Sequence, residues 1–212
     1  MKCKLMMLIM LSIFFSESKS QEKNNEVQTL FGNGGKVGGF ITTAAKAGEV
    51  NEQLGLFVGG GISAVFSSRL NIGFVGYGLV TDVDADTYLI NNEVYKLDVG
   101  YGGLLFEPVI AHKKLIHLSL PVVLGAGGSG LRLNSYHGRA WERDDLKHFD
   151  YDRIDFFLVA EPGVNIEVNI LKNVRFNVGA SYRKVYDSQL EGISDEELSG
   201  FAGSLGFKFG WF

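Results

Sequence analysis

Apolar and polar residues alternate along most of the chain after residue 36. The clearest example is the final segment, where every second residue is apolar or glycine: Phe201, Gly203, Leu205, Phe207, Phe209 and Trp211. The residues between them are small or charged. A period of two is that of a β-strand with two different faces. We expect lipid to cover the apolar face, since no later segment follows in the sequence.

Eight such segments follow one another, and the first, about 36–45, alternates least clearly. Most are near the length of about 9 to 11 residues that a tilted strand needs to cross a bilayer. Strands in lipid must pair all their backbone groups, which only a closed barrel allows. The pattern therefore predicts an all-β fold, a closed eight-stranded antiparallel up-and-down transmembrane β-barrel over residues 36–212.

The connections between the segments alternate in length. They are brief after the second, fourth and sixth segments, at 67–69, around 112–114 and at 171–173. After the first, third, fifth and seventh segments we expect longer polar loops, the longest at about 128–153. Short periplasmic turns and long outer loops are typical of outer-membrane barrels. Both chain ends are then predicted to lie in the periplasm.

The end of the chain resembles the C-terminal assembly signal of bacterial outer-membrane barrels, through Ser204, Gly206, Phe209, Trp211 and Phe212. With the eight segments, the chain resembles the small eight-stranded OmpA- and OmpX-type outer membrane protein beta-barrel domains. The resemblance implies that the barrel assembly machinery reads the final strand. It also implies a monomer surrounded by outer-membrane lipid.

The N-terminal residues resemble a secretory signal peptide. Lys2 and Lys4 precede an apolar run, and small residues at Ser18 and Ser20 suggest cleavage after residue 20. Residues 21–35 are polar and predict a flexible periplasmic segment. The chain's one cysteine, Cys3, lies in this leader, so the mature protein is expected to have no disulfide.

Composition narrows the functional classes. The formal charge of −4 argues against a nucleic-acid partner. No apolar run of about 18 residues follows the leader, which excludes a helical membrane protein. These features fit export to the bacterial outer membrane, and no motif indicates a cofactor.

Charged residues of both signs fall on the face predicted to point inward. They are Lys96, Asp98, Glu107, Glu161, Glu167, Arg175, Arg183 and Lys208. An eight-stranded barrel encloses a space that side chains can fill, and buried charges require partners. We therefore expect a charge network that plugs the interior. A water-filled pore lined by the same residues is the alternative.

Prolines interrupt three neighbouring segments, at Pro108, Pro121 and Pro162. Proline removes a ladder donor and often marks a bulge. A bulge before Glu107 is expected to turn this carboxylate inward, because unbroken alternation with Tyr95 to Tyr101 facing outward would leave it in lipid. A lateral opening between these strands is the alternative to simple bending.

His117 and Ser119 are superficially similar to the His and Ser pair of an outer-membrane lipid A deacylase. Nucleophilic catalysis requires an orienting acid and access to the substrate. The pair falls on the inward face near a periplasmic turn, so we expect a packed interior histidine. The interpretation is that the protein is not an enzyme and has no catalytic residues.

Two outer loops contain candidate binding residues. Asp82, Asp84, Asp86 and Glu93 have the spacing of calcium ligands in an EF-hand loop, but Thr87 replaces the required glycine. A solvated acidic loop without metal is the simpler interpretation. The longest loop combines aromatic and charged residues suited to contact with an extracellular protein or glycan, or to the interfacial aromatic girdle: Tyr136, Arg139, Trp141, Arg143, Phe149 and Tyr151.

These observations predict a plugged outer-membrane barrel that serves envelope structure or surface interaction through its outer loops. Three other classes stay open: an outer-membrane lipid-modifying enzyme, a small pore or hydrophobic-solute conduit, and a soluble lipocalin-like carrier. The sequence does not identify a loop partner.

Overall fold

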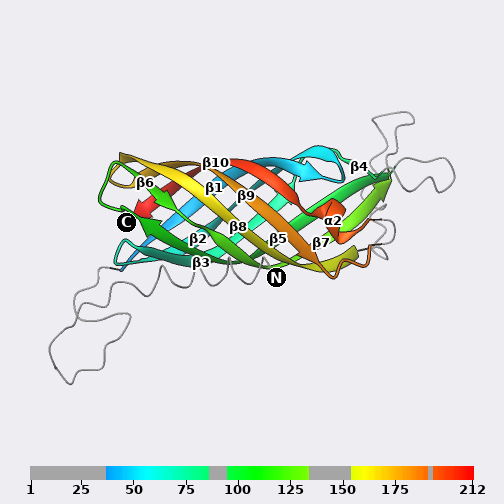
Figure 1. Ribbon diagram of the computed structural model, residues 1–212, viewed down its shortest axis with the longest axis horizontal. Coiled ribbons are helices and arrows are strands. Elements are labelled where there is room, and N and C mark those ends of the chain that lie inside the picture. Colours follow the sequence, from blue (N-terminus) through cyan, green and yellow to red (C-terminus); the bar gives the residue numbers. More distant parts are fainter. Residues whose placement is uncertain (1–36, 86–94, 134–153, 191–192) are drawn as a thin grey trace, which may run out of the picture. The chain divides into compact units, whose positions relative to one another are not determined.

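The computed structural model describes residues 37–85, 95–133, 154–190 and 193–212, and Figure 1 shows their arrangement. The described part of the chain contains ten strands and one helical turn. Their bounds are β1 Val37–Val50, β2 Gln53–Phe66, β3 Leu70–Leu79, β4 Asp84–Ala85, β5 Tyr95–Ile110, β6 Ile116–Ser119, β7 Val122–Leu133, β8 Ile154–Leu171, β9 Val174–Tyr186, α2 Asp195–Leu198 and β10 Gly200–Trp211.

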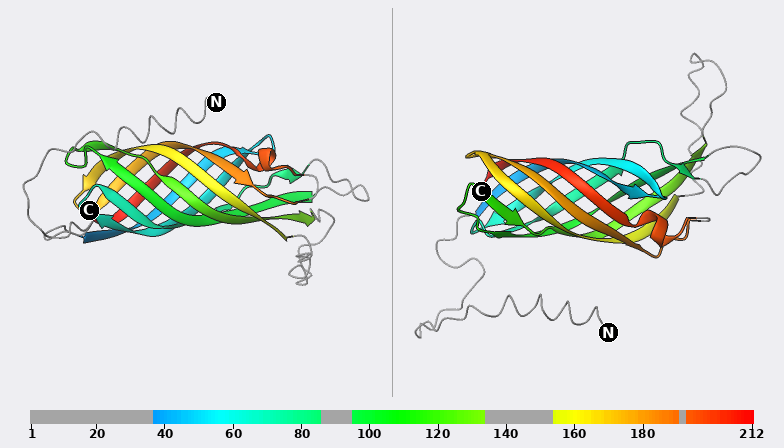
Figure 2. Two further views of the ribbon diagram at one scale, coloured as in Figure 1. Left: turned by 60° about the horizontal axis from the view of Figure 1, so that its bottom comes forward. Right: turned by 45° about the horizontal axis from the view of Figure 1, so that its top comes forward.

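The strands form a closed antiparallel ring. Successive strands of the ring pair with each other, β3 pairs with β5, and β1 pairs with β10 to close the ring (Figure 2). β6 and β7 together fill one place between β5 and β8, and β4 is a two-residue addition beside β5. The ring therefore has eight strands, and the predicted eight-stranded antiparallel fold is confirmed.

The first strand corrects the sequence prediction. The segment expected at 36–45 continues to Val50, and a two-residue turn then leads into β2. Asn51 and Glu52 both have positive φ, 49° and 59°, as in the tight turns that join antiparallel strands. The long polar loop expected here is wrong, because the alternation of Lys46 to Val50 was assigned to the loop. The brief connections at 67–69, 111–115 and 172–173 agree with the prediction.

The strands keep their register at the prolines, and the register shift of β8 against β9 lies at Asn169 to Leu171. β3 and β5 pair without interruption from Leu70 opposite Pro108 to Gly78 opposite Gly100. The bulge predicted before Glu107 is therefore wrong. Leu120 and Pro121 separate β6 from β7, where the Leu120 amide donates to the Pro108 carbonyl (3.0 Å).

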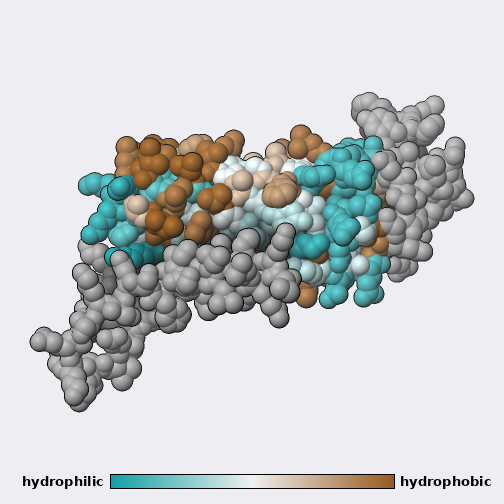
Figure 3. All heavy atoms as spheres, viewed as in Figure 1, coloured by the Kyte–Doolittle hydropathy of each residue, from teal (hydrophilic) through white to brown (hydrophobic). Residues whose placement is uncertain are grey.

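The outer wall of the ring is apolar. Large apolar side chains point away from the barrel on every strand of the ring, and Phe201, Leu205, Phe207, Phe209 and Trp211 do so on β10. Figure 3 shows apolar side chains gathered in the half nearer the C-terminus and polar ones in the half that carries α2. No helix in the described residues is long and apolar enough to cross a membrane. On the strands of the half nearer the C-terminus, Asn71, Glu107, Glu167 and Lys208 are buried in the interior.

Candidate functional site

The interior near the C-terminal end contains an ionic cluster centred on Lys208. Its Nζ lies 2.7 Å from both carboxylate oxygens of Glu107 and also contacts Glu167. The Ser119 hydroxyl lies 2.7 Å from an oxygen of each glutamate. These four side chains come from β10, β5, β8 and β6, so the closed ring brings them together. All are almost completely buried.

Further polar groups complete the shell of this inner ionic cluster. The Asn71 amide donates to Glu107 (2.8 Å), and His117 Nε2 lies 3.0 Å from Glu167. Arg175 Nη1 is 3.7 Å from Glu167. On its other side, the Arg175 guanidinium lies 3.7 Å from the ring centroid of Phe212, which also packs against Phe40. Phe212 therefore borders the inner ionic cluster instead of continuing the outward aromatic row.

A second ion pair lies farther along the barrel. Lys46 Nζ is 2.7 Å from Glu161 Oε1, and the Tyr101 hydroxyl donates to Glu161 Oε2 (2.7 Å). The Ser181 hydroxyl also donates to Glu161. The Lys46 ammonium stands 3.6 Å from the ring centroid of Tyr77, at a distance suited to a cation–π contact. Glu161 thus has three donors in the barrel interior.

A cavity of about 60 Å³ separates the two ionic groups. Polar residues Asn165, Asn177, Ser181 and Ser204 line it, and both Lys46 and Lys208 reach its ends. A polar space of this size can hold a few water molecules. The arrangement can bind water or pass a proton, whereas a solute of drug size requires several hundred cubic ångströms.

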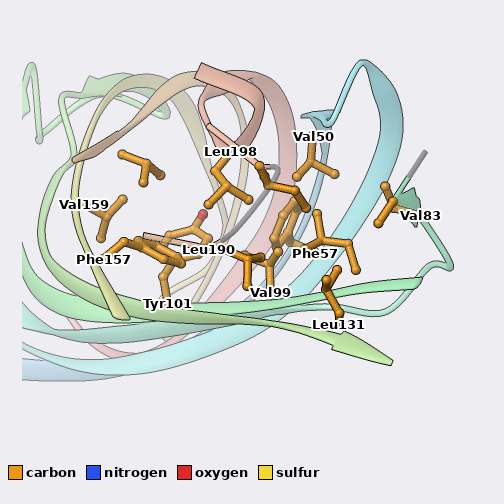
Figure 4. Close-up of a cluster of buried hydrophobic side chains, with 14 residues drawn as sticks. Val50, Phe57, Val83, Val99, Tyr101, Leu131, Phe157, Val159, Leu190 and Leu198 are labelled. Atoms are coloured by element: carbon orange, nitrogen blue, oxygen red, sulfur yellow. The ribbon is translucent and has the colours of Figure 1, made fainter. Parts of the chain in front are cut away.

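Beyond the second ion pair the interior becomes apolar. Figure 4 shows side chains from several strands meeting in one cluster, the outer apolar cluster: Val50, Phe57, Val83, Ala85, Leu97, Val99, Tyr101, Leu131, Phe157, Val159, Val185, Leu190, Ile193 and Leu198. Three of these, Leu190, Ile193 and Leu198, belong to the β9–β10 connection. That connection therefore folds over the barrel end and contributes to its core.

Polar contacts hold the β9–β10 connection in place. Ser194 caps α2 through a capping box with Glu197, which satisfies backbone donors at the helix start. Arg183 Nε donates to the Leu198 carbonyl (2.8 Å), and its Nη2 donates to the Glu49 carbonyl (2.9 Å). The Arg183 guanidinium also lies 4.5 Å from the Phe57 ring centroid. Arg183 thus joins the connection to β1 and β2.

The structure places the predicted interior charges in two groups. Six of them point inward and are buried: Glu107, Glu161, Glu167, Arg175, Arg183 and Lys208. Lys96 and Asp98 do not, because Leu97, Val99 and Tyr101 occupy the inward positions of this half of β5. Their prediction as interior residues is wrong. The outer half of β5 reverses the polarity that the sequence interpretation assumed for the whole strand, and Lys96 pairs on the outside with Asp82.

Sequence reasoning missed Lys46 as an interior charge. Lys46 follows Thr42 and Ala44 on the inward face of β1, but the segment was ended at Ala45. The period of two continues through Phe40, Thr42, Ala44 and Lys46, and following it to the end would have predicted the inward position of Lys46. Tyr77 and Tyr101 were also missed, because aromatic residues were expected to face lipid.

His117 and Ser119 both contact Glu167 inside the barrel and are buried. The Ser119 hydroxyl is directed to the two carboxylates and not toward the imidazole. Nucleophilic catalysis needs a base next to the nucleophile and access for substrate. This geometry matches a packed interior histidine better than a catalytic pair.

The loop candidates are only partly described. Asp82 contacts Lys96, and the Asp84 backbone carbonyl accepts hydrogen bonds from the Asn51 and Gln53 side chains (2.8 Å each). The other two members of the proposed calcium set, Asp86 and Glu93, lie outside the described residues, as do the six candidate contact residues of the longest loop, Tyr136 to Tyr151. The described residues contain no group of three or more His, Cys, Asp or Glu side chains that could hold a metal.

Comparison with known proteins supports the fold. No family model and no curated protein sequence matches the chain. The N-terminal β-barrel domain of Pseudomonas aeruginosa OprF is similar in structure, with a TM-score of 0.52 at 9% identity over 84% of this chain and 99% of that domain. This chain has the fold of the small outer-membrane β-barrels.

Two further solved structures are similar to a lower degree. Neisserial surface protein A gives a TM-score of 0.48 at 11% identity, and Ail of Yersinia pestis gives 0.43 at 10%. Each alignment covers 84% of this chain and 99% of the other. At such identities the likeness concerns the small outer-membrane barrel fold alone.

Proposed function

We propose that this protein is an integral barrel of the bacterial outer membrane. The proposal is carried by one observation, the outward rows of exposed large apolar side chains on a closed ring whose interior contains paired charged side chains. Ile62, Phe74, Leu205 and Trp211 are more than half exposed on this wall. A protein surrounded by water would have a strong tendency to aggregate through so large an apolar surface. This wall argues against a soluble carrier.

The interior is proposed to be plugged. The inner ionic cluster, the Lys46–Glu161 pair and the outer apolar cluster follow one another along the barrel. Each obstructs the path of a solute, and only the cavity of about 60 Å³ lies between the two ionic groups. We infer a role in envelope structure or in surface interaction through the outer loops, and no catalytic activity. The proposed loop partner is an extracellular protein or glycan.

The proposal also includes the route to the membrane. Residues 1–20 act as a signal peptide, and the barrel assembly machinery reads β10 through Phe209 and Trp211. The outward exposure of these two aromatic rings supports that role. The folded protein is proposed to be a monomer, since the ring is closed by β1 and β10 of one chain.

Fractionation of cells that make the native protein tests this function. We expect the protein in the outer-membrane fraction, with a faster gel mobility before heating than after. Recovery as a dispersed monomer in buffer without detergent would contradict membrane residence. Deletion of residues 134–153 leaves β7, which runs to Leu133, intact. It should abolish partner binding while folding is retained, as judged by heat-modifiable mobility.

A small pore is the second candidate, favoured by the polar cavity between the two ionic groups. Planar-bilayer recordings distinguish a small pore from a plugged barrel. We expect no stable channel current from the folded protein at physiological salt, because both sides of the cavity are obstructed. Regular unitary currents would contradict the plugged interior and show that the protein is a pore.

A further inference from the structure

Three short turns lie at the barrel end that holds the C-terminus, and together they form the inner rim: 67–69, 111–115 and 172–173. Four basic side chains are exposed on the inner rim, and His112 lies among them: Arg69, Lys113, Lys114 and Lys172. None of the residues in these turns is acidic. The inner rim therefore carries positive charge that its own turns do not neutralise.

Backbone hydrogen bonds tie the turns of the inner rim to the neighbouring strands. The Arg69 carbonyl accepts from the Val109 amide (2.7 Å), and the Asn173 carbonyl accepts from the Gly210 amide (2.9 Å). The turns thus extend the ladders of the ring and hold their side chains in defined places around the barrel end.

The positive charges of the inner rim lie close enough to act on one another. Desolvation lowers the pKa of the His112 side chain, and the charges of Arg69 and Lys113 lower it further. Like charges have this effect only when they are near each other. A negatively charged partner at the inner rim would relieve this repulsion.

Large apolar side chains directly border the inner rim. Leu115 and Leu171 are more than half exposed, and each is adjacent in sequence to a basic residue, Lys114 and Lys172. Figure 3 shows polar residues at this end of the barrel beside the apolar side chains. Trp211 is exposed at the same end, and tryptophan favours the boundary between hydrocarbon and headgroups. The basic side chains are therefore at the level of headgroups in a bilayer.

The acidic residues that give the chain its negative charge do not oppose an anionic partner here. Glu49, Glu52 and Glu196 are exposed at the end that carries α2. β1 has 14 residues and separates the two ends by about 35 Å along the axis, whereas physiological salt screens charges within about 8 Å. The two glutamates of the inner ionic cluster lie closer, but Lys208 and Arg175 balance them.

We propose that the inner rim binds the headgroups of anionic phospholipids in the periplasmic leaflet of the outer membrane. The headgroup phosphate accepts hydrogen bonds from the Lys and Arg side chains, while the bordering apolar side chains contact the acyl chains of the same lipid. The apolar border favours a lipid over a soluble anionic polymer, which would contact the charges alone. This inference rests on the proposed membrane residence.

Trp211 can report which lipids gather at the inner rim, because the bond between Asn173 and Gly210 places Lys172 on the strand end beside it. In a Trp141→Phe background Trp211 is the only tryptophan. The folded protein is placed in vesicles of equal amounts of phosphatidylglycerol and phosphatidylcholine, with bromine on the acyl chains of one lipid or the other. The quenching of Trp211 by each lipid gives their relative association constants.

We expect phosphatidylglycerol to associate at least about threefold more strongly than phosphatidylcholine, since each basic residue near an anionic headgroup strengthens the association severalfold. The rim variant replaces the four exposed basic residues by glutamine: Arg69→Gln, Lys113→Gln, Lys114→Gln and Lys172→Gln. It should reduce the preference to nearly one. The matched control changes the three lysines to arginine, keeps the charge and should keep the preference. Heat-modifiable mobility shows that each variant has folded.

The outcomes separate this inference from the proposed function. Equal quenching of the unsubstituted rim by the two brominated lipids would overturn headgroup binding and leave membrane residence intact. A preference that persists in the glutamine variant would overturn the inner rim as its source. No quenching by either lipid in a folded barrel would contradict membrane residence itself.

Discussion

The two halves of β5 present opposite faces to their surroundings. In the inner half, Leu104 and Phe106 are exposed on the outer wall, and Glu107 is buried inside among Lys208, Asn71 and Ser119. In the outer half, Lys96 lies outside, and the inward residues are apolar. The strand crosses this change without a bulge.

If the barrel lies in a membrane as proposed, the medium outside the wall, and not the strand itself, decides which face is apolar. Where lipid surrounds the barrel, polar side chains are driven inside and must pair there. In the half that carries α2 the interior is instead an apolar core, which the helical turn helps to cover. The ion pair Lys46–Glu161 lies close to the change, next to Tyr101 of the outer apolar cluster.

Among the variants that test this comparison, Lys208→Met is expected to have the largest effect on the stability of the barrel. The substitution leaves Glu107 and Glu167 buried with one less positive partner, which should lower the free energy of unfolding by about 3–5 kcal/mol. Reversible urea unfolding in lipid vesicles measures the change. Lys172→Met, in an exposed turn, is the control and should change stability by less than about 0.5 kcal/mol. Equal effects of both would show that the inner ionic cluster does not stabilise the barrel.

Leu198→Ala tests the apolar half of the comparison. Leu198 is completely buried in the outer apolar cluster, and a leucine truncated in a core costs about 2–5 kcal/mol. Part of the loss should appear as local opening of the β9–β10 connection, seen as faster hydrogen exchange of the Leu198 and Ser199 amides, whose acceptors lie within the same turn. Unchanged exchange and stability would mean that this residue contributes nothing to a core.

Phe212→Ala should have a smaller effect. The ring covers the Arg175 guanidinium and packs on Phe40, so its loss should cost about 1 kcal/mol in unfolding free energy. Phe212→Leu restores apolar cover without the π-system and should recover part of the loss. If Phe212 instead belongs to the lipid-facing row, Phe212→Ala will leave the solvent exchange of the Arg175 guanidinium unchanged.

Lys96→Ala should have the smallest effect. Its partner Asp82 is 59% exposed in its side chain, and pairs of this kind contribute below about 1 kcal/mol. A lysine at this position that pointed into the lumen would cost about as much unfolding free energy on substitution as Lys208. A loss above about 3 kcal/mol in the unfolding titration would therefore place Lys96 in the interior and contradict the reversal of polarity on β5.

Sequence periodicity predicted the strand ring because the alternation continues through both halves of the barrel, whichever face is apolar. It did not determine which face points inward, since a period of two is the same for a strand in lipid and for one in water. Lys96 and Asp98 were assigned to the interior because one polarity was assumed for all of β5. Glu107, Glu167 and Lys208 are buried inside as expected, because the outward side chains of their strands are apolar at that level.

The pattern of alternation could not predict contacts between strands that are distant in sequence. Lys46 and Glu161 are 115 positions apart, and their pairing follows from closure of the ring and its stagger. The inward position of Phe212 depends on the register of β10 alone, and the alternation ending at Trp211 already places Phe212 on the same face as Lys208. The contribution of Leu190 and Leu198 to the core could not be predicted, because the β9–β10 connection has no strand period.

The fluorescence of Trp211 tests the central claim, which is that hydrocarbon touches the outward apolar row. In a Trp141→Phe variant Trp211 is the only tryptophan, and its side chain stands on the outer wall of β10. In vesicles whose acyl chains carry bromine, we expect its emission to fall by at least half relative to unbrominated vesicles. Unchanged emission from a barrel that shows folded, heat-modifiable mobility would contradict the account.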